Sequence, residues 1–286
     1  MFLTRKIKYF VLIIFLGSTV WIWSVVFEQV DNNILEVTFF DVGQGDSIFI
    51  ETPNHKQVLI DGGPDKSVLE KLGQTMPFYD RTIDLIILTH PDADHLTGLI
   101  GVLKYYDVEH ILTSGLEKDT VIYQEWRELI EQKEIPLVLA QAGQNIILQE
   151  DIILEILWPD QKSIASYSKT ANNVSVVGRL VYGDKEILLT GDIESKVENI
   201  LAKQDIQSDI LKLAHHGSKT STSYNFFKAV NPEIGIISVG ENNRYKHPSQ
   251  DILDRIKDIL IYRTDKNRDI KILTNGVLFD IIIGNK

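Results

Sequence analysis

The sequence predicts an α/β protein in which strands and helices pack in layers, with an apolar helix at the N-terminus. Three observations lead to this prediction. Short apolar runs alternate with amphipathic stretches along most of the chain. A long uncharged stretch precedes them, and several of the apolar runs end in histidines and aspartates. Because 44% of the 286 residues are hydrophobic, we expect one large domain with a substantial core and a small appendage.

The uncharged stretch, residues 9–27, predicts a membrane anchor. At ~1.5 Å per residue, a helix of this length spans a hydrocarbon core of ~30 Å. Basic residues precede it and Glu28 follows it, so we expect the N-terminus in the cytoplasm and the remainder outside the cell. A cleaved signal peptide is the alternative, but its apolar region is ~7–15 residues long and ends in small residues. We therefore predict a single-pass cell-membrane protein, with residues 1–30 as cytoplasmic N-terminus and anchor helix and residues 31–286 as an extracellular domain.

Composition limits the possible functions. The absence of cysteine excludes disulfides, thiolate zinc sites and cysteine nucleophiles, so any metal ion must be held by His, Asp or Glu. The formal net charge of −11 argues against a protein that holds nucleic acid through a broad basic surface. A locally basic groove remains possible.

The order of expected elements begins with a three-stranded meander over residues 35–63, whose turns are GQG and TPNH. A buried strand at 84–89 and an amphipathic helix at 96–106 follow. A polar loop is expected at 160–170, and Asn275-Gly276 predicts the turn of a C-terminal hairpin. The other expected helices are 119–134 and 193–204. The other expected strands are 108–113, 136–140, 145–149, 152–159, 174–183, 186–192, 208–218 and 232–240.

Four strands deliver polar side chains at their C-terminal ends, where layered α/β proteins usually build sites. These side chains are His90, Asp192, His215 and those of the loop 242–247. We therefore expect a site at this end of the strands.

The stretch THPDADHLTG, residues 89–98, is the densest group of potential metal ligands. Imidazoles and carboxylates bind Zn²⁺, Mn²⁺ or Fe²⁺. An extended loop turns His90, Asp92 and Asp94 to one side, and the bend into the helix lets Asp94 and His95 serve a neighbouring ion. An alternative is that the aspartates only cap the helix, but a cap needs one aspartate and no histidine. The spacing predicts two ions that share one loop.

This stretch resembles the H-x-[HD]-x-D-H signature of the metallo-β-lactamase fold hydrolases. Seven segments, in this order, are similar to the C-terminal hydrolase domain of the ComEC family of DNA-uptake competence proteins: FFDVGQGDSIFIE, VLIDGG, THPDADHLTG, NNVSVVGRL, ILLTGD, LKLAHHGS and KHPS. The similarity covers roughly residues 35–283, and the multi-helix channel of that family has no counterpart here. The resemblance implies a four-layer sandwich, with two mixed sheets flanked by helices.

The resemblance also implies two divalent ions, Zn or Mn. His90 and Asp92 would hold the first ion, Asp192 would bridge the two, and His215 would complete the second. The full set of implied metal ligands is His90, Asp92, Asp94, His95, Asp192 and His215.

One ligand of the first ion has no counterpart. Asn172 and Asn173 stand in the region where the family usually supplies a histidine. The first ion is therefore either weakly held or helped by His216 or His247. Which of His215 and His216 is a ligand stays open, because a lone interior histidine is usually structural.

Further residues are expected around the ions. Asp61 in LIDGG resembles the family's aspartate beneath the metals, although Asp-Gly-Gly is also a simple turn. Either Asp41 or Asp46 in DVGQGD is expected close to the site, with the glycines serving the turn. His247 is expected to bind phosphate or donate a proton.

The expected reaction is hydrolysis, because two such ions polarise a substrate oxygen and lower the pKa of water toward ~7. Asp94 or Asp192 can orient the attacking water, so the catalytic residues are expected to be Asp94, Asp192 and His247. The substrate phosphate is expected to contact Lys219, Arg244 and Lys246.

The resemblance implies a DNA phosphodiester as substrate, degraded during uptake beside a DNA-uptake channel protein. The acidic composition argues the other way, since DNA-processing enzymes usually carry a basic stripe. Two alternatives stay open: a cell-envelope phosphoesterase for phosphocholine esters, and a non-catalytic, membrane-anchored accessory module of DNA uptake. β-Lactam hydrolysis is less expected, because the motifs resemble the phosphoesterase side of the superfamily.

Overall fold

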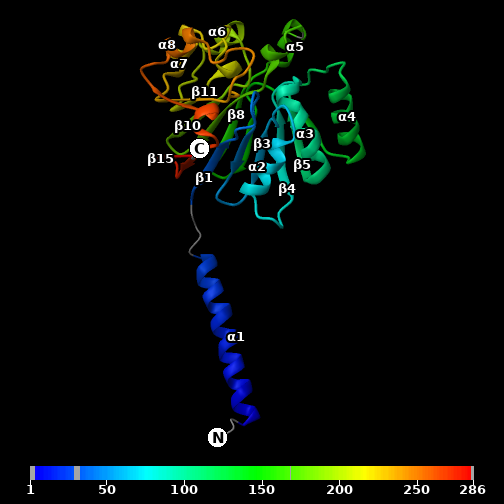
Figure 1. Cartoon of the computed structure of the whole chain (residues 1–286), viewed down its shortest axis with the longest axis vertical. Helices are drawn as coiled ribbons and strands as arrows, with labels where there is room; N and C mark the ends of the chain where they lie inside the picture. The colour runs from blue at the N-terminus through cyan, green and yellow to red at the C-terminus, as the bar shows by residue number, and fades with distance from the viewer. Residues whose placement is uncertain (1–3, 29–32, 168, 285–286) are drawn as a thin grey trace. The chain divides into compact units, whose positions relative to one another are not determined.

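The structure is a computed structural model that describes the chain except residues 1–3, 29–32, 168 and 285–286. The chain divides into two compact units, Met1–Asn33 and Ile34–Lys286. The first unit contains the helix α1 (Arg5–Glu28), drawn in blue in Figure 1. Its segment Arg5–Trp23 is long and apolar enough to cross a membrane, a property that an N-terminal signal sequence shares.

The second unit contains two sheets. The strands of the first are β1 (Leu35–Phe39), β2 (Ile48–Glu51), β3 (Gln57–Ile60), β4 (Thr82–Leu88), β5 (Asp107–Thr113), β6 (Leu137–Leu139), β14 (Ile270–Thr274) and β15 (Phe279–Ile283). Their order is β15-β14-β1-β2-β3-β4-β5-β6. The strands of the second are β7 (Asn145–Gln149), β8 (Ile152–Trp158), β9 (Val177–Tyr182), β10 (Lys185–Leu189), β11 (Ile210–Lys212), β12 (Ile234–Ile237) and β13 (Leu260–Arg263). Their order is β13-β12-β11-β10-β9-β8-β7.

Both sheets are mixed. The expected meander β1-β2-β3 and the hairpins β9-β10 and β14-β15 are antiparallel, as their tight turns require. The run β3-β4-β5-β6 and the run β10-β11-β12-β13 are parallel. Parallel neighbours bring their C-terminal ends to one edge, so the loops after β4, β10, β11 and β12 meet there.

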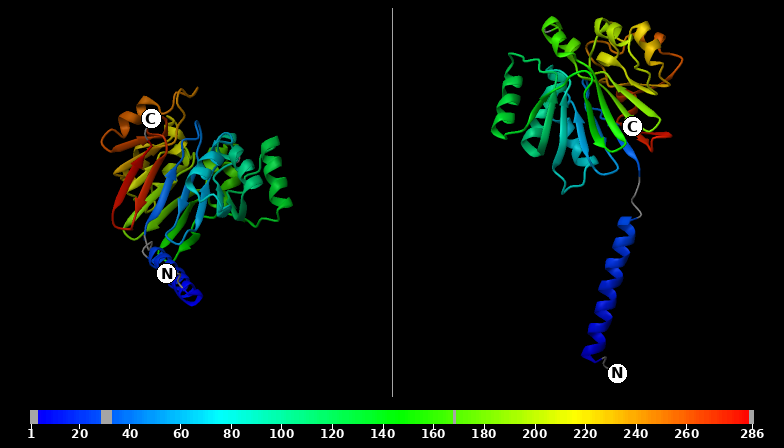
Figure 2. Two further views of the ribbon diagram at one scale, coloured as in Figure 1. Left: turned by 60° about the horizontal axis from the view of Figure 1, so that its bottom comes forward. Right: turned by 180° about the vertical axis from the view of Figure 1, so that it is seen from behind.

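Helices cover the outer face of each sheet. The helices are α2 (Ser67–Thr75), α3 (Ala93–Tyr105), α4 (Val121–Gln132), α5 (Gln161–Tyr167), α6 (Ser195–Leu201), α7 (Tyr224–Val230), α8 (Gln250–Arg255) and α9 (Thr264–Asn267). Apolar residues of α2, α3 and α4 share one core with the first sheet, and those of α6, α7 and α8 share another with the second. A third core lies between the sheets. The predicted four-layer sandwich is thus confirmed, and Figures 1 and 2 show its helices on opposite sides.

Several helices and one strand were not predicted from the pattern of apolar residues in the sequence. The expected polar loop at 160–170 contains α5, whose Tyr167 ring lies 5.8 Å from that of Trp158. The helices α2, α7 and α8 were also not expected, and each buries apolar side chains on a sheet. The strand β13 was not expected either, and its Ile261 is partly buried against the second core. Short elements of this kind depend on tertiary contacts more than on their own propensity.

Candidate metal centre

The predicted strand ends converge on one cluster of histidines and carboxylates. Four overlapping groups of three residues each have ligand atoms within 4.8 Å of one another. They are His90-His95-Asp192, Asp94-His95-His216, Asp46-Asp192-His216 and Asp46-Asp61-His95. All members except Asp94 are buried. They come from the loops after β1, β3, β4 and β10, from the first turn of α3, and from the 3₁₀ turn after β11.

The atoms of this cluster fit a metal ion. The Nε2 atoms of His90, His95 and His216 are buried and have no hydrogen-bond partner in the described part of the chain, and the same holds for Asp192 Oδ1. Buried polar atoms are normally satisfied. Three imidazole nitrogens left free beside carboxylates are the donor set that divalent ions such as zinc prefer. The cluster therefore fits divalent ions.

The group that we call the second position consists of Asp94, His95, Asp192 and His216. Asp192 Oδ2 lies 3.3 Å from His95 Nε2 and 3.4 Å from His216 Nε2. His216 Nε2 also lies 3.6 Å from Asp94 Oδ2. The ring nitrogen of each imidazole that points away from Asp192 has its own partner. His95 Nδ1 is 2.7 Å from Asp61, and His216 Nδ1 donates to the Ser238 carbonyl at 2.8 Å. Such contacts fix which nitrogen faces an ion.

The structure places His216, not His215, at this position. Both residues lie in the 3₁₀ turn η2 (Ala214–Gly217) with left-handed backbone, φ 51° and 55°. This conformation costs about 1–2 kcal/mol for a residue other than glycine. It separates the two adjacent imidazoles: His216 is buried in the cluster, and His215 lies outside it, 3.3 Å from Asn172 and 3.8 Å from Glu194.

The first position consists of His90 and Asp92. Asp92 Oδ2 lies 3.9 Å from His90 Nε2, and its other oxygen is paired with Lys118. Asp92 also stands at the N-cap of α3 without a capping side-chain hydrogen bond, which contradicts the capping alternative for this residue. Asn172 and Asp92 both line a hollow that opens beside the cluster. Asn173 does not, because its amide is bound to Glu194.

Asp61 lies under both positions. Its buried carboxylate accepts hydrogen bonds from the Thr89 backbone at 2.8 Å and the Thr89 hydroxyl at 2.7 Å, besides contacting His95. Thr89 Oγ1 is in turn 3.1 Å from His90 Nδ1. Asp61 therefore orients His95 directly and His90 through Thr89.

Of the two candidates in DVGQGD, Asp46 joins the cluster and Asp41 does not. The Asp41 backbone N–H donates to Asp269 at 2.7 Å, and its carboxylate is paired with Arg268 at 3.3 Å. The loop that contains Asp46 packs so closely against the start of α3 that a Cβ on Gly45 would lie 2.1 Å from the Asp94 carbonyl oxygen. The glycine is thus required by this approach and not only by a turn.

Charge within the cluster is unevenly distributed. Burial lowers the pKa of His90 to about 3. Burial also opposes charge on His216, but the Asp192 carboxylate outweighs it and raises the pKa of His216 to about 10. The pKa of His95 is raised well above its ordinary value in the same way. Burial raises the pKa of Asp192, yet His216 and His95 outweigh it, and the pKa lies well below the usual range. The second position therefore stabilises positive charge.

A hollow of about 120 Å³ opens beside the cluster and leads to a wider groove of about 430 Å³. The two share Gln44, Asp94 and Tyr245. His247 lines the hollow, and Arg244 lines the groove. The other two expected phosphate-binding residues, Lys219 and Lys246, are exposed and line neither.

Residues 40–241 match the family model "Metallo-beta-lactamase superfamily". The chain belongs to the metallo-β-lactamase superfamily. Within it, the predicted similarity to competence proteins is confirmed. ComE operon protein 3 of Bacillus subtilis is 32% identical over 259 residues, which are 82% of this chain and 32% of the relative. Competence protein ComA of Neisseria gonorrhoeae is 30% identical over 245 residues, 83% of this chain and 32% of the relative.

The chain thus spans about a third of the length of the curated relatives it matches. The metallo-beta-lactamase fold protein YhfI of Bacillus subtilis superposes with a TM-score of 0.55 at 11% identity, covering 83% of this chain and 99% of that one. That likeness concerns the fold. Superfamily membership and the convergent histidines and aspartates support a metal-dependent hydrolase.

Two lysines near the site were not anticipated. Lys118 reaches Asp92 from the loop before α4, and Lys212 lies fully buried in β11 beside Asp46. For Lys212 the sequence carries a signal, because a single charge in the apolar run ILKLA is unusual in a buried strand. Lys118 has no such signal.

Proposed function

We propose that this chain is a membrane-anchored phosphodiesterase that hydrolyses DNA with two divalent ions, Zn or Mn. The observation that carries the proposal is the convergence of three unsatisfied imidazole nitrogens and Asp192 beside an open hollow. When bound there, divalent ions would polarise a phosphoryl oxygen, lower the pKa of water and neutralise charge in the transition state. The second position would be held by Asp94, His95, Asp192 and His216. The first would be held by His90 and Asp92 with Asp192 between the two.

The chain's own residues have separate roles in this reaction. Burial raises the pKa of Asp94, but its contacts with His216 and His95 outweigh this and lower it below the ordinary value. Asp94 therefore stays ionised at neutral pH and can accept a hydrogen bond from the attacking water. Burial lowers the pKa of His247 to about 4, and its Nδ1 has no partner among the described residues. We assign the neutral His247 to hydrogen bonding with a phosphate oxygen.

The groove favours DNA over a phosphocholine ester. A quaternary ammonium group is usually recognised by the open face of an aromatic ring. The exposed ring of Tyr245 carries the Arg244 guanidinium 4.8 Å from its centroid on one side, and the His247 ring is stacked on it at 5.7 Å. A quaternary ammonium on the Tyr245 ring would be repelled by the positive charge of Arg244. A second phosphate of DNA would be attracted to Arg244, and a base can stack on such groups.

The N-terminal helix and the relatives support a proposal for anchoring and cellular role. We propose that α1 crosses the membrane with its N-terminus in the cytoplasm, that residues 31–286 act outside, and that a DNA-uptake channel protein is a partner. The names of the relatives support competence as the context. The basic segment before the span supports the orientation.

The test uses the full chain in detergent with Mn²⁺ or Zn²⁺ and three substrates: bis-p-nitrophenyl phosphate, a p-nitrophenyl phosphocholine ester and single-stranded DNA. We expect turnover of the first and third and its loss in Asp94→Ala, while Asp41→Ala, in a loop of the same site but outside the cluster, stays active. Turnover of the phosphocholine ester alone would favour the envelope esterase. A folded chain that turns over none would favour the accessory module.

A further inference from the structure

Lys212 is a fully buried lysine directly beneath the metal centre. Its ammonium is paired with the Asp46 carboxylate, donates to the Gly191 carbonyl at 3.1 Å and lies 3.8 Å from Asp192 Oδ1. Lysine is almost never fully buried unless it is paired. Neither Lys212 nor Asp46 has a place in the catalytic roles proposed above.

Asp46 connects this lysine to both imidazoles of the second position. Its Oδ1 lies 3.5 Å from His216 Nδ1, and its Oδ2 lies 3.9 Å from His95 Nδ1. Asp46 is held in place by its backbone, whose N–H donates to the Asp94 carbonyl at 3.3 Å. The Asp46 carboxylate thus lies beneath His95 and His216, on the side of these ligands away from the hollow.

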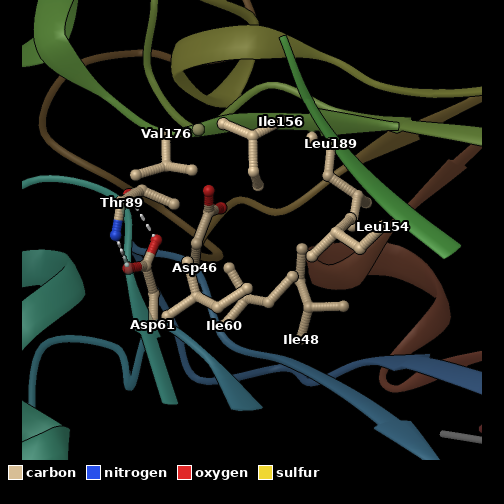
Figure 3. A pocket seen from close by; sticks show the side chains of 12 residues that line it. Asp46, Ile48, Ile60, Asp61, Thr89, Leu154, Ile156, Val176 and Leu189 are labelled. Atoms are coloured by element: carbon tan, nitrogen blue, oxygen red, sulfur yellow. Dashed lines mark hydrogen bonds between the residues drawn. The ribbon is translucent and has the colours of Figure 1, made fainter. Parts of the chain in front are cut away.

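Asp46 is only 2% exposed, so bulk water does not reach its carboxylate. A cavity of about 10 Å³ lies below Asp46, between the two sheets, which is room for about one water molecule. Figure 3 shows Asp46 and Asp61 at its polar end, with Ile48, Leu154 and Leu189 on its apolar walls. Among the described residues, Lys212 is the only lysine or arginine paired with Asp46. The ammonium therefore makes the shortest ion pair with Asp46, closer than the imidazoles of His216 and His95.

The lower part of the cluster would otherwise attract an ion. Two of its four groups contain Asp46, one with Asp192 and His216 and one with Asp61 and His95. The Lys212 ammonium lies between these groups, paired with Asp46 and 3.8 Å from Asp192 Oδ1. A lysine ammonium is ordinarily charged at neutral pH, so it occupies the space where a further cation could sit.

We propose that Lys212 is a positioning residue whose ammonium acts as a fixed cation under the metal centre. It holds Asp46 and one oxygen of Asp192, so that the other oxygen of Asp192 stays directed at His95 and His216, and it excludes divalent ions from the lower groups. The inference rests on metal binding by the two groups that lack Asp46, His90-His95-Asp192 and Asp94-His95-His216. It does not depend on DNA as the substrate.

The experiment compares the full chain in detergent with three variants. Lys212→Met leaves Asp46 unpaired, and Asp46→Asn combined with Lys212→Met removes the pair while keeping both shapes and the net charge. The matched control is Asp209→Asn with Lys185→Met, an ion pair of 3.3 Å on the same sheet that is outside the cluster. Bound Mn per chain is counted after dialysis, affinity is measured by calorimetry, and melting in EDTA reports the fold.

We expect the Asp46→Asn, Lys212→Met double variant to melt in EDTA close to the wild type, because replacing both members of a buried pair is often near neutral. It should bind two ions with roughly 10- to 100-fold lower affinity, the usual effect of losing a contact behind a ligand. Lys212→Met, where it folds, should bind more than two. The control should bind like the wild type.

A double variant that binds two ions with wild-type affinity would overturn the inference and reduce the pair to a core contact. If the wild type itself binds no metal, the inference and the proposed function both fail. Metal binding as expected without hydrolysis of DNA would overturn the proposed function alone.

Discussion

The first and second positions of the metal centre are built differently. The second has four donors from three chain segments: the first turn of α3, the loop after β10 and the turn η2. Both of its imidazoles are buried, and the Nδ1 atom of each has a hydrogen-bond partner. The first has a buried His90, but its Asp92 side chain is 30% exposed and already paired with Lys118. Asn172 and His215, which line the hollow beside both positions, contact each other. Preorganised donors lose less freedom on binding, so we infer a tight second site and a weak first one.

The largest effect is expected from Asp192, which the two positions share. Asp192→Ala removes a donor from both, so it should lower activity at least about 100-fold and reduce bound metal to less than one ion per chain. Metal analysis after dialysis and the bis-p-nitrophenyl phosphate assay check this. Two ions retained in Asp192→Ala would show that the halves do not share a ligand.

Substitutions of the adjacent histidines His215 and His216 should distinguish the first and second positions most clearly. His216→Ala should weaken the tighter ion roughly 100-fold, because it removes a buried donor. His215→Ala, its matched neighbour, should leave the tighter ion unchanged and affect the weaker one a few-fold. Calorimetric titration with Mn²⁺ separates the two. The reverse pattern would assign the second position to His215.

Stability of the metal-free chain should depend on pH with opposite signs in the two halves. His216, with a pKa of about 10, binds a proton in the folded state between pH 6.5 and 10 that the unfolded chain has released. Its contribution is complete below pH 6.5 and is lost as the pH rises toward 10.

His90, with a pKa of about 3, stays neutral while the unfolded chain becomes protonated, so stability falls as the pH drops below 6.5. Melting in EDTA should peak near pH 6.5. His216→Ala should reduce the loss of stability on the alkaline side and leave the acid side unchanged, while His95, whose pKa is also raised, keeps part of the alkaline loss. An unchanged alkaline side would contradict the charge assigned to the second position.

The smallest effect is expected from Lys118. Its ion pair with Asp92 is partly exposed, and such pairs contribute about 0.2–1 kcal/mol. Lys118→Met should therefore raise the affinity of the weaker ion roughly two- to five-fold. Lys104→Met, an exposed pair with Glu125 on neighbouring helices, is the control. Unchanged weak-site affinity in Lys118→Met would mean that Lys118 does not compete with an ion.

Local sequence patterns predicted the parts whose geometry is local. The hairpins β9-β10 and β14-β15 follow from their turn residues. The spacing of His90, Asp92, Asp94 and His95 along one stretch of chain predicted a shared site. In the structure His90, Asp94 and His95 belong to the cluster, and Asp92 lies beside it, 3.9 Å from His90. The helix α5 was missed because its order depends on contacts such as that of Tyr167 with Trp158.

The sequence by itself determined the donor types and the strand ends that carry them, because alternation along a strand and the absence of cysteine are properties of the chain. Only the tertiary structure decided that His216 and Asp46, and not His215 and Asp41, belong to the cluster. It also showed that Lys212 is the buried partner of Asp46. Those choices depend on a left-handed turn and on contacts between two sheets. Neighbours in the sequence differ in such environments, and the packing of distant strands sets which of them is enclosed.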